Sequence, residues 1–309
     1  MDTLLLTLAK AYGPTANEKG VKDLIEKELD TAFDEIRTDA LGNFIGYKRG
    51  TDKAGKKIML TVPMDEKCFI ITHVEKRGKY KFSILGSLDF KKIVDANVVF
   101  GNGVKGTILL EEYAEDPLKV SDLYIETQIS DEEQKGSIKL GSSAVFDGKY
   151  IEGEDNITSP ALNPRGGCRI LIDLVKSLDI NLKSDLFVVF SCHGMVESRG
   201  TLTAAYGINP DIGISLGGIS EEDGPELGQG PVIIVRDMAS VSNPDLIEEF
   251  EKVAHGADVK TQRAISPQWT SNAAGILRAG CDTKIISLGY AVKAMATDKE
   301  QISKEDRKS

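Results

Sequence analysis

The hydrophobic positions along this chain follow two spacings, and each spacing predicts a different kind of element. Apolar residues recur at helical spacing between Glu18 and Ala32, with Asn17 as the expected N-cap. Continuously apolar runs at Lys57–Val62 and Asp185–Ser191 are typical of strands buried on both faces of a sheet. The same pattern predicts the helices Gly166–Leu178, Arg199–Tyr206, Asn243–Ala254 and Ser271–Ala279, and the strands Phe33–Asp39, Asn43–Lys48, Ile212–Leu216 and Thr283–Leu288.

The pattern of hydrophobic and polar residues changes between Cys68 and Tyr150. Short β-rich pieces alternate there with glycines and charged turns, and Ser130–Lys135 is the one candidate helix. Even spacing of short strands favours a small barrel or sandwich inserted into a larger domain. We therefore expect an α/β domain of residues 1–67 plus 151–309, with a mixed, largely parallel sheet flanked by helices, interrupted by a β-barrel-like domain of residues 68–150. The charged stretch Asp298–Ser309 is expected to be frayed.

The composition is that of an ordinary globular protein, with 41% hydrophobic and 28% charged residues. A net charge of −10 argues against nucleic acid and anionic membranes as partners, because both are bound by basic patches. The N-terminus has no basic region before its brief apolar stretch, and no apolar run approaches the roughly 18–20 residues that cross a bilayer. These features predict a cytoplasmic protein.

Histidine is scarce in this chain. It occurs only as His73, His193 and His255, and the four cysteines are widely spaced without a CxxC pair, so we expect reduced, buried thiols. Cys192 and His193 do not make a good nucleophile–base pair, because neighbouring residues of a strand point to opposite faces. His73 and His255 are expected at an insert strand and at a helix end.

Several motifs follow one another in the order of a known family. They are Thr38-Asp-Ala-Leu-Gly-Asn43, Pro63-Met-Asp-Glu66, Ala161-Leu-Asn-Pro-Arg-Gly-Gly-Cys168, Arg199-Gly200 with Thr203-Ala-Ala205, Tyr206-Gly-Ile-Asn-Pro-Asp211, Leu227-Gly-Gln-Gly-Pro231 and Asn243-Pro244. Over essentially its whole length the chain resembles the tetrahedral or glutamyl (deblocking) aminopeptidases, which are dinuclear metallo-aminopeptidases related to the CelM proteins. The resemblance implies a peptidase domain interrupted by a barrel-like dimerisation domain, dimers that build a hollow dodecamer, and two divalent metals, zinc or cobalt.

The residues that match the family's metal ligands are of other types. The histidine of the family's Ala-His-Met-Asp-Glu motif corresponds to Pro63, and the bridging aspartate corresponds to Asn163. The Glu-Glu pair, which supplies the general base and one ligand, corresponds to Gly194 and Met195. The next acidic ligand corresponds to Gly217. An amide and a thioether would form a soft, uncharged site with little affinity for dications.

The resemblance implies further replacements toward the end of the chain. The last ligand histidine falls at about Ala294, and the family's Thr-Asp near the substrate corresponds to Ser271-Asn272. Without a glutamate at Gly194 there is no general base in the expected place, so no catalytic residue, no metal and no cofactor are expected. The residues retained around this vestigial site are Asp65, Glu66, Asn163 and Arg165.

These comparisons favour a catalytically inactive aminopeptidase paralogue with a structural, regulatory or peptide-binding role. Its expected partners are peptides, copies of itself, or active paralogues in one oligomer. Two alternatives stay open. One is an active hydrolase whose site has moved to Asp65, Glu66, His193 and the acidic run Glu221–Asp223. The other is a small-ligand pocket in the vacated cleft. Asp65, which has no ligand histidine to orient, is expected to accept hydrogen bonds from nearby backbone.

Overall fold

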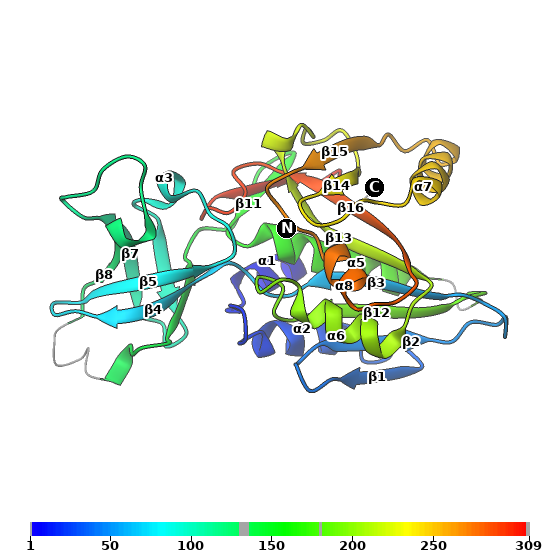
Figure 1. Cartoon of the computed structure of the whole chain (residues 1–309), viewed down its shortest axis with the longest axis horizontal. Helices are drawn as coiled ribbons and strands as arrows, with labels where there is room; N and C mark the ends of the chain where they lie inside the picture. The colour runs from blue at the N-terminus through cyan, green and yellow to red at the C-terminus, as the bar shows by residue number, and fades with distance from the viewer. Residues whose placement is uncertain (1, 130–135, 179–180, 307–309) are drawn as a thin grey trace.

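An eight-stranded mixed sheet forms the larger of the two bodies of the molecule (Figure 1). The computed structural model describes residues 2–129, 136–178 and 181–306. The strand order is β1-β2-β12-β3-β13-β16-β14-β15, in which β12, β3, β13 and β16 are mutually parallel. The strands span β1 Glu35–Thr38, β2 Phe44–Lys48, β3 Lys57–Pro63, β12 Asp185–Ser191, β13 Ile212–Ser220, β14 Val232–Asp237, β15 Gln262–Ser266 and β16 Lys284–Val292.

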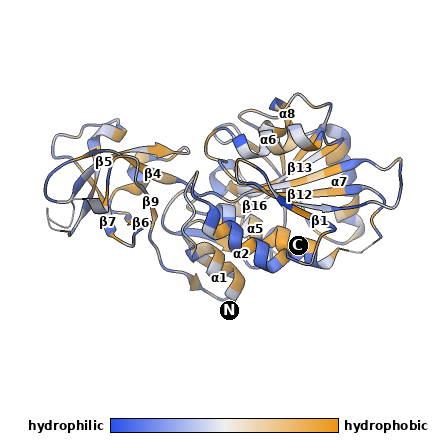
Figure 2. Ribbon diagram, turned by 90° about the horizontal axis from the view of Figure 1, so that it is seen from below, coloured by the Kyte–Doolittle hydropathy of each residue, from blue (hydrophilic) through white to orange (hydrophobic). Residues whose placement is uncertain are grey.

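Helices cover both faces of this sheet, which explains why its central strands are continuously apolar (Figure 2). In β12, the successive residues Val188 and Val189 point to opposite faces, and both are fully buried. Val188 packs with α1, α2 and α5, whereas Val189 packs with α6 and α8. The helices are α1 Thr3–Lys10, α2 Lys19–Leu29, α5 Leu162–Ser177, α6 Arg199–Ile208, α7 Pro244–Gly256 and α8 Ala273–Arg278.

The smaller body is a closed antiparallel barrel of six strands. It is formed by the part of the chain inserted between β3 and α5. Its interior is aromatic: the Phe69 ring meets those of Phe82 and Phe146 edge-on, with centroids 5.2 and 5.1 Å away. The barrel and its short helices comprise β4 Cys68–Val74, β5 Lys79–Leu85, α3 Phe90–Ile93, β6 Asn97–Phe100, β7 Lys105–Leu110, η1 Val120–Asp122, β8 Leu123–Thr127 and β9 Ser143–Phe146.

The predicted fold class is confirmed: a largely parallel sheet flanked by helices carries an inserted β-barrel. The division into domains at residues 67/68 and 150/151 stays a prediction. The candidate helix Ser130–Lys135 lies outside the described residues. No helix in the described ranges is long and apolar enough to cross a membrane.

Several local predictions were wrong at element boundaries. Helix α2 begins after Glu18, and Asn17 makes no cap. Helix α5 begins at Leu162, four residues before the predicted start at Gly166, because Pro164 in its first turn is compatible with a helix N-terminus. Helix α1 and strands β14 and β15 were not predicted.

Within the described residues, which end at Asp306, the stretch from Asp298 is ordered, contrary to the predicted fraying. Residues Glu300–Ser303 form strand β17, which pairs with β11 (Asn156–Ser159) in a three-stranded sheet completed by β10 (Ile151–Glu152). The Asp306 carboxylate is buried and accepts the backbone N–H groups of Gly228 and Gly230, at 2.7 and 2.8 Å. A carboxylate is expected to be exposed when only water can supply its hydrogen-bond donors. Here the backbone of the Gly228–Gly230 loop supplies those donors, so a charged residue is buried.

Replacement of Asp306 by alanine should destabilise the protein, because it leaves two backbone donors without their acceptor. We expect the free energy of unfolding to fall by about 1–3 kcal/mol in urea titrations. Lys299→Ala, at an exposed position in the same stretch, is the matched control and should have little effect. Equal stability of Asp306→Ala and the wild type would mean that this segment does not contribute to the fold.

Candidate functional site

A cavity of about 440 Å³ lies at the carboxyl ends of the parallel strands. Open α/β sheets place ligands at this edge, because several strands there release loops toward one point. Pro63 ends β3, Met195 follows β12, Gly217 lies in the last part of β13, and Asn163 belongs to the first turn of α5. The chain therefore brings to one cavity four positions that lie up to 154 residues apart in its sequence, from Pro63 to Gly217.

Asp65 holds one wall of this cavity. It is fully buried, and its two oxygens accept the N–H groups of Gly194 and Met195 and the hydroxyl of Thr15, at 2.8, 2.9 and 2.7 Å. Burial raises the pKa of this carboxyl, and the three donors oppose that shift. Asp65 thus fixes the backbone of the loop after β12 and presents no free oxygen to the cavity.

Asn163 is held on the opposite wall. Its Oδ1 accepts the N–H of Gly218 at 2.9 Å, and its Nδ2 donates to the Met295 sulfur at 3.4 Å. Its own N–H donates to Glu300, whose other oxygen accepts the N–H of Ala296. Burial raises the pKa of Glu300. The amide oxygen of Asn163, the one atom that could bind a cation, is therefore already used by the backbone.

Gly194 and Gly217, two of the glycines that line the cavity, differ in the space around them. A Cβ at Gly194 would lie 2.6 Å from Oδ1 of Asp65 and 2.9 Å from Cβ of Pro63, so no side chain fits without displacing a wall. A Cβ at Gly217 would meet nothing within 4 Å, so this position opens into the cavity. Only the second position has room for a larger residue.

The end of the site differs from the sequence expectation by one residue. Ala294 is exposed and does not line the cavity, whereas Met295 does and contacts Asn163. Ser271 and Asn272 also line it. The Asn272 amide donates to Ser191 Oγ at 3.0 Å and therefore joins α8 to β12.

Glu66 and Arg165 form a buried ion pair that does not line the cavity. Arg165 Nη2 lies 2.8 Å from Glu66 Oε1, and the guanidinium also donates to the carbonyls of Leu8 and Ala11. Gly13 leaves room for this pair, because a Cβ there would lie 2.6 Å from Arg165 Nη2. Burial raises the pKa of Glu66 to about 7, although Arg165 acts to lower it. This pair joins α1, α5 and the end of β3.

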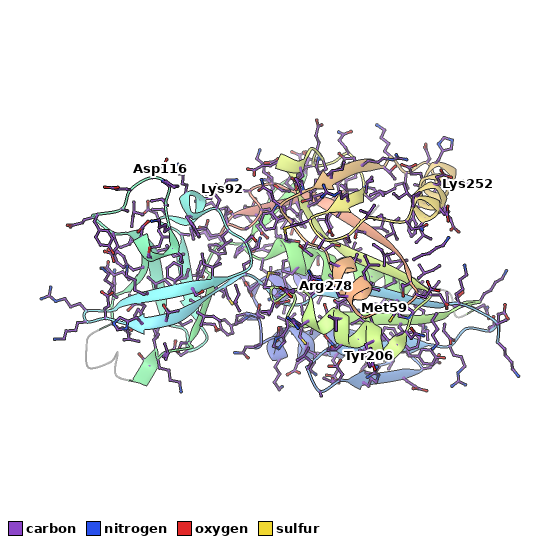
Figure 3. The ribbon with its side chains drawn as sticks, in the orientation of Figure 1. Met59, Lys92, Asp116, Tyr206, Lys252 and Arg278 are labelled. Atoms are coloured by element: carbon purple, nitrogen blue, oxygen red, sulfur yellow. The ribbon has the colours of Figure 1, made fainter. Side chains whose placement is uncertain are left out.

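The charged side chains on the cavity wall are few, and three of the four have partners. Asp237 accepts four hydrogen bonds, from the N–H groups of Ala239, Ser240 and Ser271 and the Ser240 hydroxyl. Glu197 pairs with Arg278, the last residue of α8, which is labelled in Figure 3. The fourth is Lys67, whose amine nitrogen is buried without a hydrogen-bond partner in the described part of the chain. Sequence analysis did not single out Lys67.

The residues of the alternative, relocated site are not gathered at the cavity. His193 lies outside its lining, its backbone N–H donates to Glu18, and its carbonyl accepts the N–H of Arg199. In the acidic run, Glu222 pairs with Lys92 and Asp223 accepts the Ser266 hydroxyl. Within residues 2–129, 136–178 and 181–306, no three His, Cys, Asp or Glu side chains form a group that could hold a metal ion.

The sheet, the inserted barrel and the cavity between the strand ends and α5 define an aminopeptidase-type α/β fold. Residues 42–309 match the model of the M42 glutamyl aminopeptidase family, so the chain belongs to this family. It is 32% identical to a protein of Acetivibrio thermocellus provisionally named an aminopeptidase, over 86% of this chain and 82% of the relative. It is 24% identical to the lysyl aminopeptidase of Pyrococcus furiosus, over 87% and 83%.

Solved structures show the same architecture. An aminopeptidase of the archaeon Desulfurococcus kamchatkensis superposes with a TM-score of 0.91 at 25% identity, covering 99% of this chain and 90% of that one. The TET1 peptidase of Pyrococcus horikoshii, described as assembling into a tetrahedron or a large octahedral shell, has a TM-score of 0.86 at 22% identity, covering 99% and 95%. The family uses divalent metals.

Replacement of Glu66 by glutamine should change how stability depends on pH. Because the folded-state pKa of Glu66, about 7, lies above its ordinary value of 4.5, the protonated form favours folding, and this contribution is lost as the pH rises from 4.5 to about 7. Over this interval we expect the free energy of unfolding of the wild type to fall by about 3 kcal/mol relative to Glu66→Gln.

Urea unfolding at several pH values in this interval measures the difference. Glu154→Gln, which changes an exposed carboxylate, should run parallel to the wild type. If the stability of Glu66→Gln also runs parallel to that of the wild type, Glu66 is already ionised at the lower pH and burial does not raise its pKa.

Proposed function

We propose that this chain is a catalytically inactive member of its family, which keeps the peptidase fold and cavity and acts in a structural, regulatory or peptide-binding role. The observation that carries the proposal is the composition of the cavity wall. By the resemblance, the family's ligands and general base correspond to six positions, of which Pro63, Asn163, Gly194, Met195 and Gly217 line one cavity and Ala294 does not. None of them carries a carboxylate or an imidazole.

This donor set does not fit two divalent metals. Zinc and cobalt sites in proteins are built from imidazole, thiolate and carboxylate ligands, and bridging positions need negative charge. Proline and glycine side chains supply no donor, and the Asn163 oxygen already accepts the Gly218 N–H. The nearest retained acid, Asp65, accepts three hydrogen bonds and holds the loop. No step of catalysis is therefore assigned to a metal in this chain.

An oligomer fits the distribution of exposed apolar residues. Tyr113 and Leu140, both in the segment inserted between β3 and α5, expose 67% and 71% of their surface. Exposed apolar side chains gathered in one patch mark interaction surfaces, and Tyr206 on α6 of the larger body is also exposed, at 76%. We infer that the barrel mediates contacts with a second copy of this chain or with an active paralogue, as the assembly described for the P. horikoshii peptidase suggests.

The purified protein should retain less than one equivalent of zinc, cobalt or manganese after dialysis, and it should not hydrolyse aminoacyl-nitroanilides. Metal analysis and a chromogenic assay beside an active family member measure both properties. Two bound metals would overturn the proposal. Metal-dependent turnover that disappears in Asp65→Ala, with the variant still folded by circular dichroism, would instead favour the relocated hydrolase site.

A bulky residue at Gly217 should block ligands from the cavity, because that position faces open space. For a tripeptide with a free N-terminus, we expect Gly217→Phe to weaken binding at least about tenfold in calorimetric titrations. Gly256→Phe is the matched control, since Gly256 also faces open space but lies at the exposed end of α7. Equal affinity of both variants would show that peptides do not bind in this cavity.

A further inference from the structure

Lys67 occupies an unusual position for a lysine. It follows Glu66 in the short connection between β3 and β4, and its side chain lines the cavity. The residue as a whole is half-buried, but its amine nitrogen is shielded from solvent. Within the described part of the chain this nitrogen has no hydrogen-bond partner. Lysine amines are normally solvated or paired, so an unpartnered amine at a cavity needs a reason.

The neighbours of Lys67 hold its side chain in place. The amine nitrogen lies 3.8 Å from the centre of the Trp269 ring. A Cβ at Gly86 would lie 2.9 Å from Cγ of Lys67 and 3.1 Å from the sulfur of Met195, so the lysine stem runs close beneath that glycine. The amine is therefore fixed among apolar groups and cannot turn outward without disturbing this packing.

No carboxylate forms an ion pair with Lys67 in the described ranges. Asp237 and Glu197, the acids on the cavity wall, are engaged by other groups. Glu300 acts on Lys67 at longer range, with both of its oxygens bound to backbone N–H groups. Burial lowers the pKa of the Lys67 amine to about 7, although the Glu300 charge opposes this shift. A desolvated lysine of this kind is a nucleophile near neutral pH.

We propose that Lys67 is a nucleophilic amine that captures the carbonyl group of a small aldehyde or keto acid bound in the cavity. The nitrogen lone pair forms a bond to the carbonyl carbon, and the π electrons of that carbonyl move to its oxygen. Proton transfer from nitrogen to oxygen gives a carbinolamine. Loss of the oxygen as water then leaves a carbon–nitrogen double bond, so the step is a reversible condensation that needs no oxidant or reductant.

This inference rests on the proposed function in one respect only, which is that the cavity holds no metals. The absence of metals and the nucleophilic role of Lys67 can therefore be disproved independently of each other. Metal analysis tests the absence of metals, whereas amine chemistry is tested by covalent labelling of Lys67.

The test uses the full-length wild type with glyoxylate and cyanoborohydride near pH 7, followed by proteolysis and mass spectrometry. The hydride reduces any imine to a stable secondary amine. We expect Lys67 to be labelled about tenfold or more faster than Lys252, an exposed lysine on α7 (Figure 3). Labelling of Lys67 at or below the rate of Lys252 would overturn the proposal.

Two variants separate a nucleophile from a simple positive charge. Lys67→Met removes the amine, and Lys67→Arg keeps a cation that forms no imine under these conditions. We expect glyoxylate to raise the melting temperature of the wild type and of neither variant. If Lys67→Arg is stabilised as strongly as the wild type, residue 67 only attracts the carboxylate of glyoxylate, and the proposal is wrong.

Discussion

Three buried carboxylates hold the framework on which the cavity depends. A carboxylate removed from water needs donors on its oxygens, and losing them costs several kcal/mol. Asp65 takes its donors from the loop after β12, Glu66 from Arg165 and the Gly13 backbone, and Glu300 from the first turn of α5 and the turn before β17. Each acid therefore joins segments that lie far apart in the sequence, and the cavity is the space that these joined segments leave open.

The central sheet was predictable because burial on both of its faces requires continuously apolar strands, which a short stretch of sequence reveals. Val188 and Val189 illustrate this, since both are apolar and face opposite layers. Elements that depend on distant partners were not predictable. Strand β17 is charged and polar, and it is ordered because β11 pairs with it and because Asp306 meets the backbone of Gly228 and Gly230. No local pattern contains that information.

The candidate site likewise has residues that the sequence predicts and a residue that it does not. Motif order and the rule that parallel strands end at one edge were enough to predict that Pro63, Asn163, Met195 and Gly217 lie together. The rule could not identify Lys67, whose burial follows from the packing of Trp269 and Gly86. One signal was available: a charged residue stands directly before Cys68 and Phe69, where the chain enters the barrel, and its side chain must lie beside the strand ends.

In its charged form, the Lys67 amine would repel divalent metals bound in the same cavity. At an effective dielectric constant of about 20, unit charges 4 Å apart interact by about 4 kcal/mol, and two dications multiply that repulsion. A protein that held both metals would therefore exclude an ammonium group there, or keep it elsewhere in solvent. Under the proposed function, Asn163, Met195 and Gly217 stand at the family's ligand positions and supply none of the anions that such metals require. The amine of Lys67, which is partly neutral, then partly balances the negative charge of Glu300 at longer range. The uncharged side chains of Asn163 and Met195 and the buried amine of Lys67 therefore act in the same direction, because both disfavour dications in this cavity.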